Sequence, residues 1–249
     1  MKRYLLVVWG MLSLSQLCGA GELHEFRTLD GKCVKAEILA YNGRLDVVTL
    51  KLPNQSMKKV HPGLFVAKDR EYIKNWSFIF GLKNPSKFAV KVNKKQGDYE
   101  RKDVRGSGTV KIQEVRYDIA VENLNSFPLE NLSIEYKIFL KPRGDGRWPN
   151  GLSSLLGPVD ELQNPPPVCG AKECLKIDPS ETVQFETRYA RSVKLKSSGR
   201  ADSSGKKFKN QELDLEGIWV RVIMEIGDEM VFRDFFAPKA LEGKYSWDD

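Results

Sequence analysis

Three cysteines could supply thiol chemistry in the main part of the chain. Cys33 stands alone near the N-terminus, whereas Cys169 and Cys174 are separated by only four residues in a proline-rich segment. In an oxidising compartment this spacing favours a local disulfide between Cys169 and Cys174, and it leaves Cys33 as a free thiol. The alternatives for the close pair are two reduced thiols or half of a metal site.

Histidine is scarce, which limits the reactions that the chain could catalyse. The sequence contains only His24 and His61, and His61 lies in a His-Pro-Gly turn. Serine and cysteine nucleophiles need a histidine beside them, and a zinc site needs about four ligands. Cys33 could form a dyad with His24, but the sequence indicates no third residue to orient the pair. We therefore expect a non-catalytic protein without a metal or a cofactor.

Carboxylates are numerous, so the main catalytic alternative is an extracellular hydrolase with an acidic pair. Such a pair must face one cleft across a fixed gap. The candidates lie in a long loop and around an expected hairpin turn: Asp160, Glu161, Asp178, Glu225, Asp228 and Glu229. Because Gly-Asp is a common turn dipeptide, the hairpin acids are more simply explained as solvated turn residues.

One aromatic side chain indicates binding. Trp148 lies beside Arg147 in the loop sequence GDGRWPNG, where it has little local core to join. An exposed tryptophan in such a loop is suited to stacking on a sugar or to contacting a protein. The alternative is that Trp148 folds back onto a sheet and belongs to the core.

Basic residues are concentrated in two stretches of a chain whose formal net charge is +7. Residues 83–116 carry ten Lys or Arg against four acids, and residues 191–209 carry seven against one. A surface for anionic polysaccharide would explain both stretches, with Lys206, Lys207 and Lys209 in the second. The simpler explanation is a solvated Gly/Ser-rich loop and an edge strand protected by lysine.

The first twenty residues have the three-part layout of a secretory signal peptide. Lys2 and Arg3 precede an apolar run at residues 4–12, and small residues follow, so we expect cleavage after Ala20. Lipidation of Cys18 is the alternative. The apolar run is shorter than the roughly 20 residues of a membrane helix. The sequence therefore predicts a secreted or periplasmic protein, or one associated with the cell surface, that neither spans the membrane nor meets nucleic acid.

Residues 22–78 are expected to form a small, strongly curved β-barrel. Short alternating runs are separated by turn signals at Asp30-Gly31, Asn42-Gly43 and Pro53-Asn54. Asp-Gly and Asn-Gly tolerate the positive φ of a hairpin turn. Residues 64–76 can then place apolar side chains on one face of a short closing helix.

A more specific pattern runs through this segment: Arg27-Thr28, Asp30-Gly31, Ala36-Glu37, Val48 and Leu50, Val60, Leu64, Asp69 and Tyr72-Ile73. With this pattern, residues 24–76 resemble the Sla-type homology domain. That family is an SH3-like module known from a yeast endocytic adaptor and found in secreted proteins of planctomycete and verrucomicrobial bacteria. The resemblance implies an SH3-like fold, a bacterial source and binding of a protein or peptide.

Residues 87–240 predict a second, larger β domain after a linker at residues 79–86. Long runs alternate with a period of two and show no sustained helical periodicity. Ile112 and Val115 break the alternation, which indicates a β-bulge at Gln113-Glu114. We therefore expect an all-β chain in which an SH3-like barrel is followed by an antiparallel immunoglobulin-like β-sandwich.

Two parts of this second domain are expected to be irregular. Six prolines lie from Pro142 to Pro167, so residues 141–180 should form a long surface loop. The tail at residues 241–249 should be ordered only if Trp247 packs on the sandwich. Together these features favour a secreted binding or structural protein of a bacterial envelope that recognises a protein or peptide. A binder of anionic or sugar polymers is the second hypothesis, and the hydrolase is the third.

Overall fold

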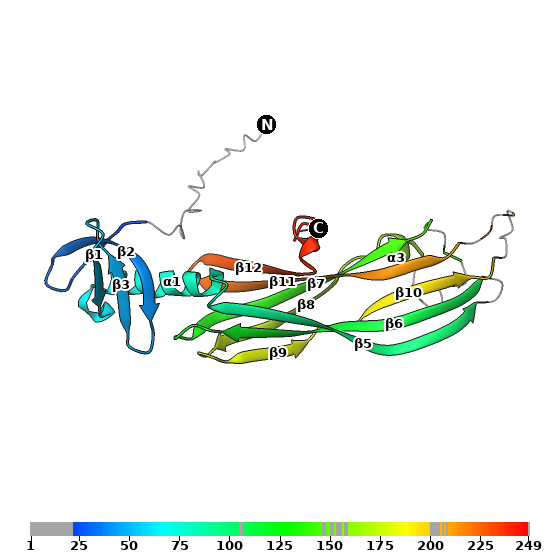
Figure 1. The fold of residues 1–249 in the computed structure, drawn as a ribbon, viewed down its shortest axis with the longest axis horizontal. Helices are drawn as coiled ribbons and strands as arrows, with labels where there is room; N and C mark the ends of the chain where they lie inside the picture. The colour runs from blue at the N-terminus through cyan, green and yellow to red at the C-terminus, as the bar shows by residue number, and fades with distance from the viewer. Residues whose placement is uncertain are drawn as a thin grey trace, which may run out of the picture. The chain divides into compact units, whose positions relative to one another are not determined.

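The computed structural model describes residues 22–248 except for positions 105–106, 146–147, 150–151, 153–155, 157–158, 200–204, 206 and 208. The chain divides into two units after Phe80 (Figure 1). Strands dominate the described residues and all of their pairings are antiparallel, which confirms the predicted all-β class. Helix α1 (Ala67–Lys83) occupies the first part of the predicted linker at residues 79–86, so the linker prediction is wrong up to Lys83.

The first unit is a four-stranded antiparallel sheet followed by α1. Its strands lie in chain order and are β1 (His24–Arg27), β2 (Cys33–Asn42), β3 (Val47–Lys51) and β4 (Met57–Val60). A short 3₁₀ helix, η1 (Pro62–Leu64), precedes α1. One apolar cluster joins the sheet to η1 and α1: Phe26, Ala36, Ile38, Val48, Leu50, Phe65 and Ile73. The Asp-Gly turn forms as expected, with Gly31 at a φ of 84°.

The second unit is built from eight strands. They are β5 (Phe88–Val104), β6 (Gly108–Asn123), β7 (Leu129–Arg143), β8 (Val168–Ile177), β9 (Thr182–Glu186), β10 (Ala190–Ser197), β11 (Gln211–Ile226) and β12 (Glu229–Ala237). Their order is β5-β6-β10-β11-β7-β8, with β9 also beside β6 and β12 also beside β11. A short helix, α3 (Val159–Gln163), lies between β7 and β8.

A band of register shifts crosses the second unit, and we call this band the waist. Residues 97–98 of β5 face one residue of β6, and residues 187–189, between β9 and β10, face two. In β11, Glu216 is an extra residue relative to β7. Ile112, Val193 and Leu213 form one row across β6, β10 and β11. Relative to this row, the shifts in β5, between β9 and β10, and in β11 lie near the same level.

The waist separates two apolar cores. On one side, Val110, Ile112 and their neighbours on β10 and β11 are covered by side chains from the segment between β7 and β8: Trp148, Leu152 and Leu162. On the other side, β6 pairs with β9 instead of β10, and the ring of Phe185 on β9 approaches the ring of Tyr136 on β7 at 6.4 Å. The hydroxyl of Tyr136 also accepts a hydrogen bond from Arg188 N at 2.8 Å.

The parity change in β6 has a different origin from the predicted bulge. Ile112 and Val115 are both buried, as the sequence pattern indicates. However, the extra residues lie in the strands that flank β6 and not at Gln113-Glu114. The side-chain amide of Gln113 donates to the carbonyl oxygen of Gly97 at 2.9 Å, which satisfies one of the backbone groups that the shift in β5 leaves unpaired.

The predicted loop at residues 141–180 is wrong over much of its length. β7 continues to Arg143, and residues 168–177 form the edge strand β8. The middle of β8, residues 170–173, has Ala171 as its one apolar side chain, so its alternation is weak in the sequence. Gly170 is required in it, because a Cβ at this position would overlap the ring and hydroxyl of Tyr136 directly opposite.

The chain after β12 is packed onto the sheet. Leu241, in the short helix η3 (Lys239–Leu241), is buried beside Phe139 and Trp219. Trp247 meets the ring of Trp219 edge-on with centroids 4.8 Å apart. Trp247 thus packs on the sheet, which is the contact that an ordered tail was expected to require, and the tail is described up to residue 248.

Candidate functional site

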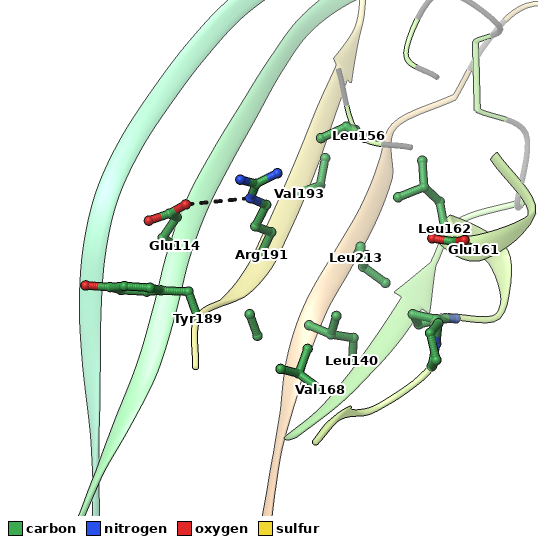
Figure 2. Close-up of a pocket in the computed structure, with 13 residues that line it drawn as sticks. Glu114, Leu140, Leu156, Glu161, Leu162, Val168, Tyr189, Arg191, Val193 and Leu213 are labelled. Carbon is green, nitrogen blue, oxygen red and sulfur yellow. Dashed lines mark ion pairs between the residues drawn. The ribbon is translucent and has the colours of Figure 1, made fainter. Parts of the chain in front are cut away.

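A cavity of about 460 Å³ lies at the waist of the second unit (Figure 2). Its apolar floor comes from β7, β10 and β11 through Leu140, Val193 and Leu213. Val168, the first residue of β8, contributes to its wall. The remaining apolar lining comes from the segment between β7 and β8: Leu156, Leu162, Pro165 and Pro166.

The register shifts give the cavity a polar side. Glu114 of β6 and Arg191 of β10 line it, with the Glu114 carboxylate 3.6 Å from Nε of Arg191. Tyr189 is one of residues 187–189, between β9 and β10. It lies against Gly97, which belongs to the register shift in β5. A Cβ at Gly97 would lie 2.9 Å from Cε1 of Tyr189. The guanidinium carbon of Arg116 is 5.1 Å from the centre of the Tyr189 ring, which holds the ring in place.

Glu161 on α3 provides a second carboxylate on the opposite side. Figure 2 shows Glu161 and Leu162 across the apolar floor from Glu114 and Arg191. Glu114 has a cation within reach, whereas Glu161 has no ion-pair partner among the described residues. Two carboxylates and one guanidinium therefore surround an apolar floor. Pockets of this size and lining are typical of sites that bind ligands.

Trp148 is not the exposed binding residue that its loop position suggested. Only 4% of its surface is exposed, and it packs with Leu152, Leu162 and Val193. It is therefore a core residue and cannot stack on a sugar. Lys207 and Lys209 are exposed, whereas Arg147 and Lys206 lie outside the described residues. Trp148 folds back because Leu152 and Leu162, later in the same segment, create the core that it joins.

Among the described residues, six cations of the two basic stretches are paired with acids, five of them on neighbouring strands. Lys95 Nζ lies 2.5 Å from the Asp118 carboxylate across β5 and β6, and Lys194 lies 3.4 Å from Glu212 across β10 and β11. Further pairs join Lys91 to Glu122, Lys102 to Glu100, Arg116 to Glu186 and Arg191 to Glu114. These pairs offset part of the local charge excess, which weakens the case for polymer binding.

The two histidines take part in local hydrogen bonds in the first unit. Nε2 of His24 is 2.9 Å from the buried carboxylate of Asp69, which also accepts from Arg27 N at 2.6 Å. The ring of His24 stacks on Tyr72 with centroids 3.8 Å apart. Cys33 pairs with Arg27, three residues from His24 along β1, so the two side chains are roughly 10 Å apart and on opposite faces. The structure does not form the candidate dyad.

His61 also has a structural role. Its Nδ1 accepts a hydrogen bond from Gly63 N at 3.0 Å, and its Nε2 is 2.9 Å from the carboxylate of Asp46. The same carboxylate accepts from the hydroxyl of Tyr41 at 2.8 Å. Burial, followed by this hydrogen bond, raises the pKa of Tyr41 to about 12.

The disulfide predicted between Cys169 and Cys174 is wrong. Both residues lie in the extended strand β8, and both are free. Five residues of strand place their Cα atoms roughly 16 Å apart, whereas a disulfide needs about 4.4 to 6.8 Å. Cys169 is exposed, and burial raises the pKa of the Cys174 thiol. Cys33 is exposed and forms no disulfide with a described residue.

The described carboxylates among those suggested by the sequence do not gather at one site, and the side chain of Asp160 lies outside the described part of the structure. Glu161 lies with Leu213 at the cavity, whereas Glu225 is the penultimate residue of β11, twelve residues after Leu213 and roughly 40 Å away along the strand. Asp178 pairs with Lys176 after β8. Glu114 is the acid that faces Glu161 across the cavity, and it is not among the carboxylates that the sequence suggested as a catalytic pair. Its only signal was the break in alternation between Ile112 and Val115.

Neither a metal site nor a membrane helix is found in the part of the chain that the structure describes. Within it, His, Cys, Asp and Glu nowhere form a group of three or more that could hold a metal ion. None of its helices has the length and apolar character needed to cross a membrane.

Comparison with known proteins does not assign a family. No family model matches the chain, and no curated protein matches it. A solved structure titled "X-ray structure of Northeast Structural Genomics Consortium target SoR45" aligns with 59% of this chain and 93% of its own, at 13% identity and a TM-score of 0.24.

Proposed function

We propose that this chain is a secreted, non-catalytic binding protein of a bacterial envelope, and that its second unit holds part of a protein or peptide ligand in the waist cavity. The waist cavity is the observation that carries this proposal. Its floor is formed by Leu140, Val193 and Leu213, and charged groups stand only around it. Such a lining suits an apolar or amphipathic group of a ligand.

The finer identities of the two units form part of the same proposal. The first unit is an SH3-like barrel of the Sla type, supported by the roles of residues in the pattern that carries the resemblance. Asp69 binds the backbone of β1, Tyr72 stacks on His24, and Ile73 lies in the core. The second unit is an immunoglobulin-like sandwich, supported by the contacts of Tyr136 with Phe185 and Arg188. The layout of residues 1–20 supports secretion.

The apolar floor also argues against the rival hydrolase. Glu114 and Glu161 face one cavity, as a glycosidase pair would. However, the cavity floor carries no polar side chain to bind sugar hydroxyl groups, and the carboxylate of Glu114 is next to Arg191. Binding of a peptide group is therefore the function that the lining supports best.

Filling the cavity should abolish ligand binding without unfolding the protein. Peptides selected from a displayed library on the purified protein should lose at least roughly tenfold in affinity when Val168→Trp occupies the cavity wall. Gln184→Trp, on β9 and outside the cavity, should leave their affinity unchanged because Gln184 is already exposed. Fluorescence anisotropy with labelled peptides measures both effects.

A second blocking variant protects this test against misfolding. Pro166→Trp, on the other wall, should reproduce the loss, since Pro166 is exposed and lies outside the strands. Circular dichroism should show both variants folded. Equal binding by the wild type and both folded cavity variants would refute the proposed function.

A further inference from the structure

We infer that the waist cavity takes the basic side chain of an extended peptide, which pairs with the free edge of β8. This inference rests on the proposed function and specifies its ligand. Three observations carry it: the charge around the cavity, the apolar path between the charged groups, and the strand edge at which the cavity opens.

The charge around the cavity favours a cation. Among the described residues, Glu114, Glu161 and Arg191 are the charged side chains that line it, so acids exceed bases by one there. Arg191 contacts Glu114 only through Nε at 3.6 Å, which is a loose pair, and its side chain is 62% exposed. Glu161 has no cation near it among the described residues. A ligand ammonium or guanidinium group would therefore find an unpaired carboxylate here, whereas a ligand carboxylate would face two acids.

The floor between the carboxylates suits the stem of a basic side chain. Leu140, Val193 and Leu213 form an apolar surface between Glu114 and Glu161, as Figure 2 shows. Lysine and arginine bury their aliphatic stems on apolar surfaces while the charged head stays at a polar edge. A purely apolar side chain would fill the floor but leave Glu161 without a partner.

The neighbouring strand edge indicates that this side chain belongs to a peptide. In the described part of the chain, β8 pairs with β7 alone, so its other edge is open. Residues 171–173 are exposed, which leaves room for another strand. Val168 begins this edge and also lines the cavity. In antiparallel pairing, the residue opposite Val168 points to the same face, with Cβ atoms about 4.5 to 5.5 Å apart, and so places its side chain at the cavity.

Three labelled peptides test the charge assignment. Each has threonine and valine on both sides of a central lysine, norleucine or glutamate. By fluorescence anisotropy, the lysine peptide should bind the wild type roughly twofold to fivefold more tightly than the norleucine peptide, as expected for an exposed charge pair. The glutamate peptide should bind most weakly.

Two charge variants should move this preference in opposite directions. Glu161→Gln should remove the advantage of the lysine peptide, while Glu225→Gln, an exposed acid on β11 outside the cavity, should not. Arg191→Gln should increase the advantage, because it frees Glu114. Tightest binding of the glutamate peptide, or a lysine preference that survives Glu161→Gln, would overturn the inference.

The thiol of Cys169 can test pairing along β8, because it is exposed and adjacent to Val168. In a Cys33→Ser background, a lysine peptide with a thiopyridyl-activated cysteine beside the lysine should form a mixed disulfide with Cys169 and release pyridinethione. Trapping should be faster than with the matching glutamate peptide, and Glu161→Gln should abolish the difference. Equal trapping rates for both peptides on the wild type would show that the peptide does not pair there.

The outcomes separate this inference from the proposed function. If Val168→Trp weakens all three peptides but Glu161→Gln changes none of their affinities, the cavity is a binding site and the charge assignment is wrong. If Val168→Trp and Pro166→Trp change no affinity, the proposed function itself fails. Butylamine that binds as tightly as the lysine peptide would overturn the peptide assignment.

Discussion

At the scale of single residues, the cysteines show how a strand changes the meaning of a spacing. Cys169 and Cys174 are close in sequence, and in a loop they could meet. In β8 they are five positions apart on an extended backbone, so one faces solvent and the other faces the interior. Cys169 is therefore available to reagents and Cys174 is not.

Thiol titration of the folded, unreduced protein expressed from Gly21, and so without Cys18, should give two fast thiols and one slow thiol. Cys33 and Cys169 are exposed, whereas burial raises the pKa of Cys174 and lowers its thiolate fraction. Cys33→Ser and Cys169→Ser should each remove one fast thiol, measured by the absorbance of released thionitrobenzoate. Loss of both fast thiols in the wild type would instead show that these residues are oxidised.

At the scale of elements, the register shift in β11 anchors the C-terminal tail. Its extra residue, Glu216, accepts hydrogen bonds from the side chains of Lys244 and Tyr245. Burial alone would raise the pKa of Glu216, but these two hydrogen bonds outweigh burial and the net shift is downward. The ionised carboxylate is therefore favoured in the folded protein.

Tail docking should consequently weaken in acid. Because the folded pKa of Glu216 lies below its usual value of 4.5, the ionised carboxylate contributes stability above that value. This contribution is lost as the pH falls through the folded pKa. The wild type should melt at a higher temperature than Glu216→Gln at pH 6, and the difference should shrink below about pH 4.5.

A matched acid in the tail controls this experiment. Glu242→Gln should leave the melting temperature unchanged at both pH values, since Glu242 is exposed. Tryptophan fluorescence reports the tail directly, because Trp219 and Trp247 are in contact. A pH-independent difference between the wild type and Glu216→Gln would contradict this role of the carboxylate.

The elements also show what the sequence could and could not predict. The Asp30-Gly31 turn and the strands of the first unit follow from local signals, whereas the Asn42-Gly43 turn is longer than its sequence signal predicts and has its positive φ at Asp46. The sequence does not indicate strand β8, because its alternation of apolar and polar residues is weak. The need for glycine at position 170 comes from Tyr136 on the neighbouring strand β7, and this contact cannot be read from the residues of β8. Glu114 was missed because the register shifts that place it at the cavity lie in β5 and between β9 and β10. Pairing between distant segments decided these features, and a single sequence does not record it.

At the scale of the whole molecule, the basic excess is explained by strand pairing. β5 is an edge strand that pairs only with β6 in the described chain, and it carries much of the first basic stretch. Lysine on an edge strand opposes pairing with another molecule. Two of these lysines, Lys91 and Lys95, also reach acids on β6.

Retention on heparin should therefore be weak and should depend little on the second basic stretch. Reversing Lys207 and Lys209 to Glu should shift the eluting salt concentration no more than reversing Lys58 and Lys59, which are exposed on β4 in the other unit. Salt-gradient chromatography measures the shift. A much larger effect of the Lys207 and Lys209 reversals would favour the hypothesis of anionic polymer binding.

The waist has a consequence for how such a protein can change over evolution. A one-residue insertion or deletion within a strand normally exchanges interior and exterior along the rest of it. Here β5, the β9–β10 segment and β11 each carry an extra residue near the same level, so the two halves of the second unit keep separate side-chain parities. We expect one half to accept changes in length or residue pattern that leave the other intact, so that each half evolves as a separate module.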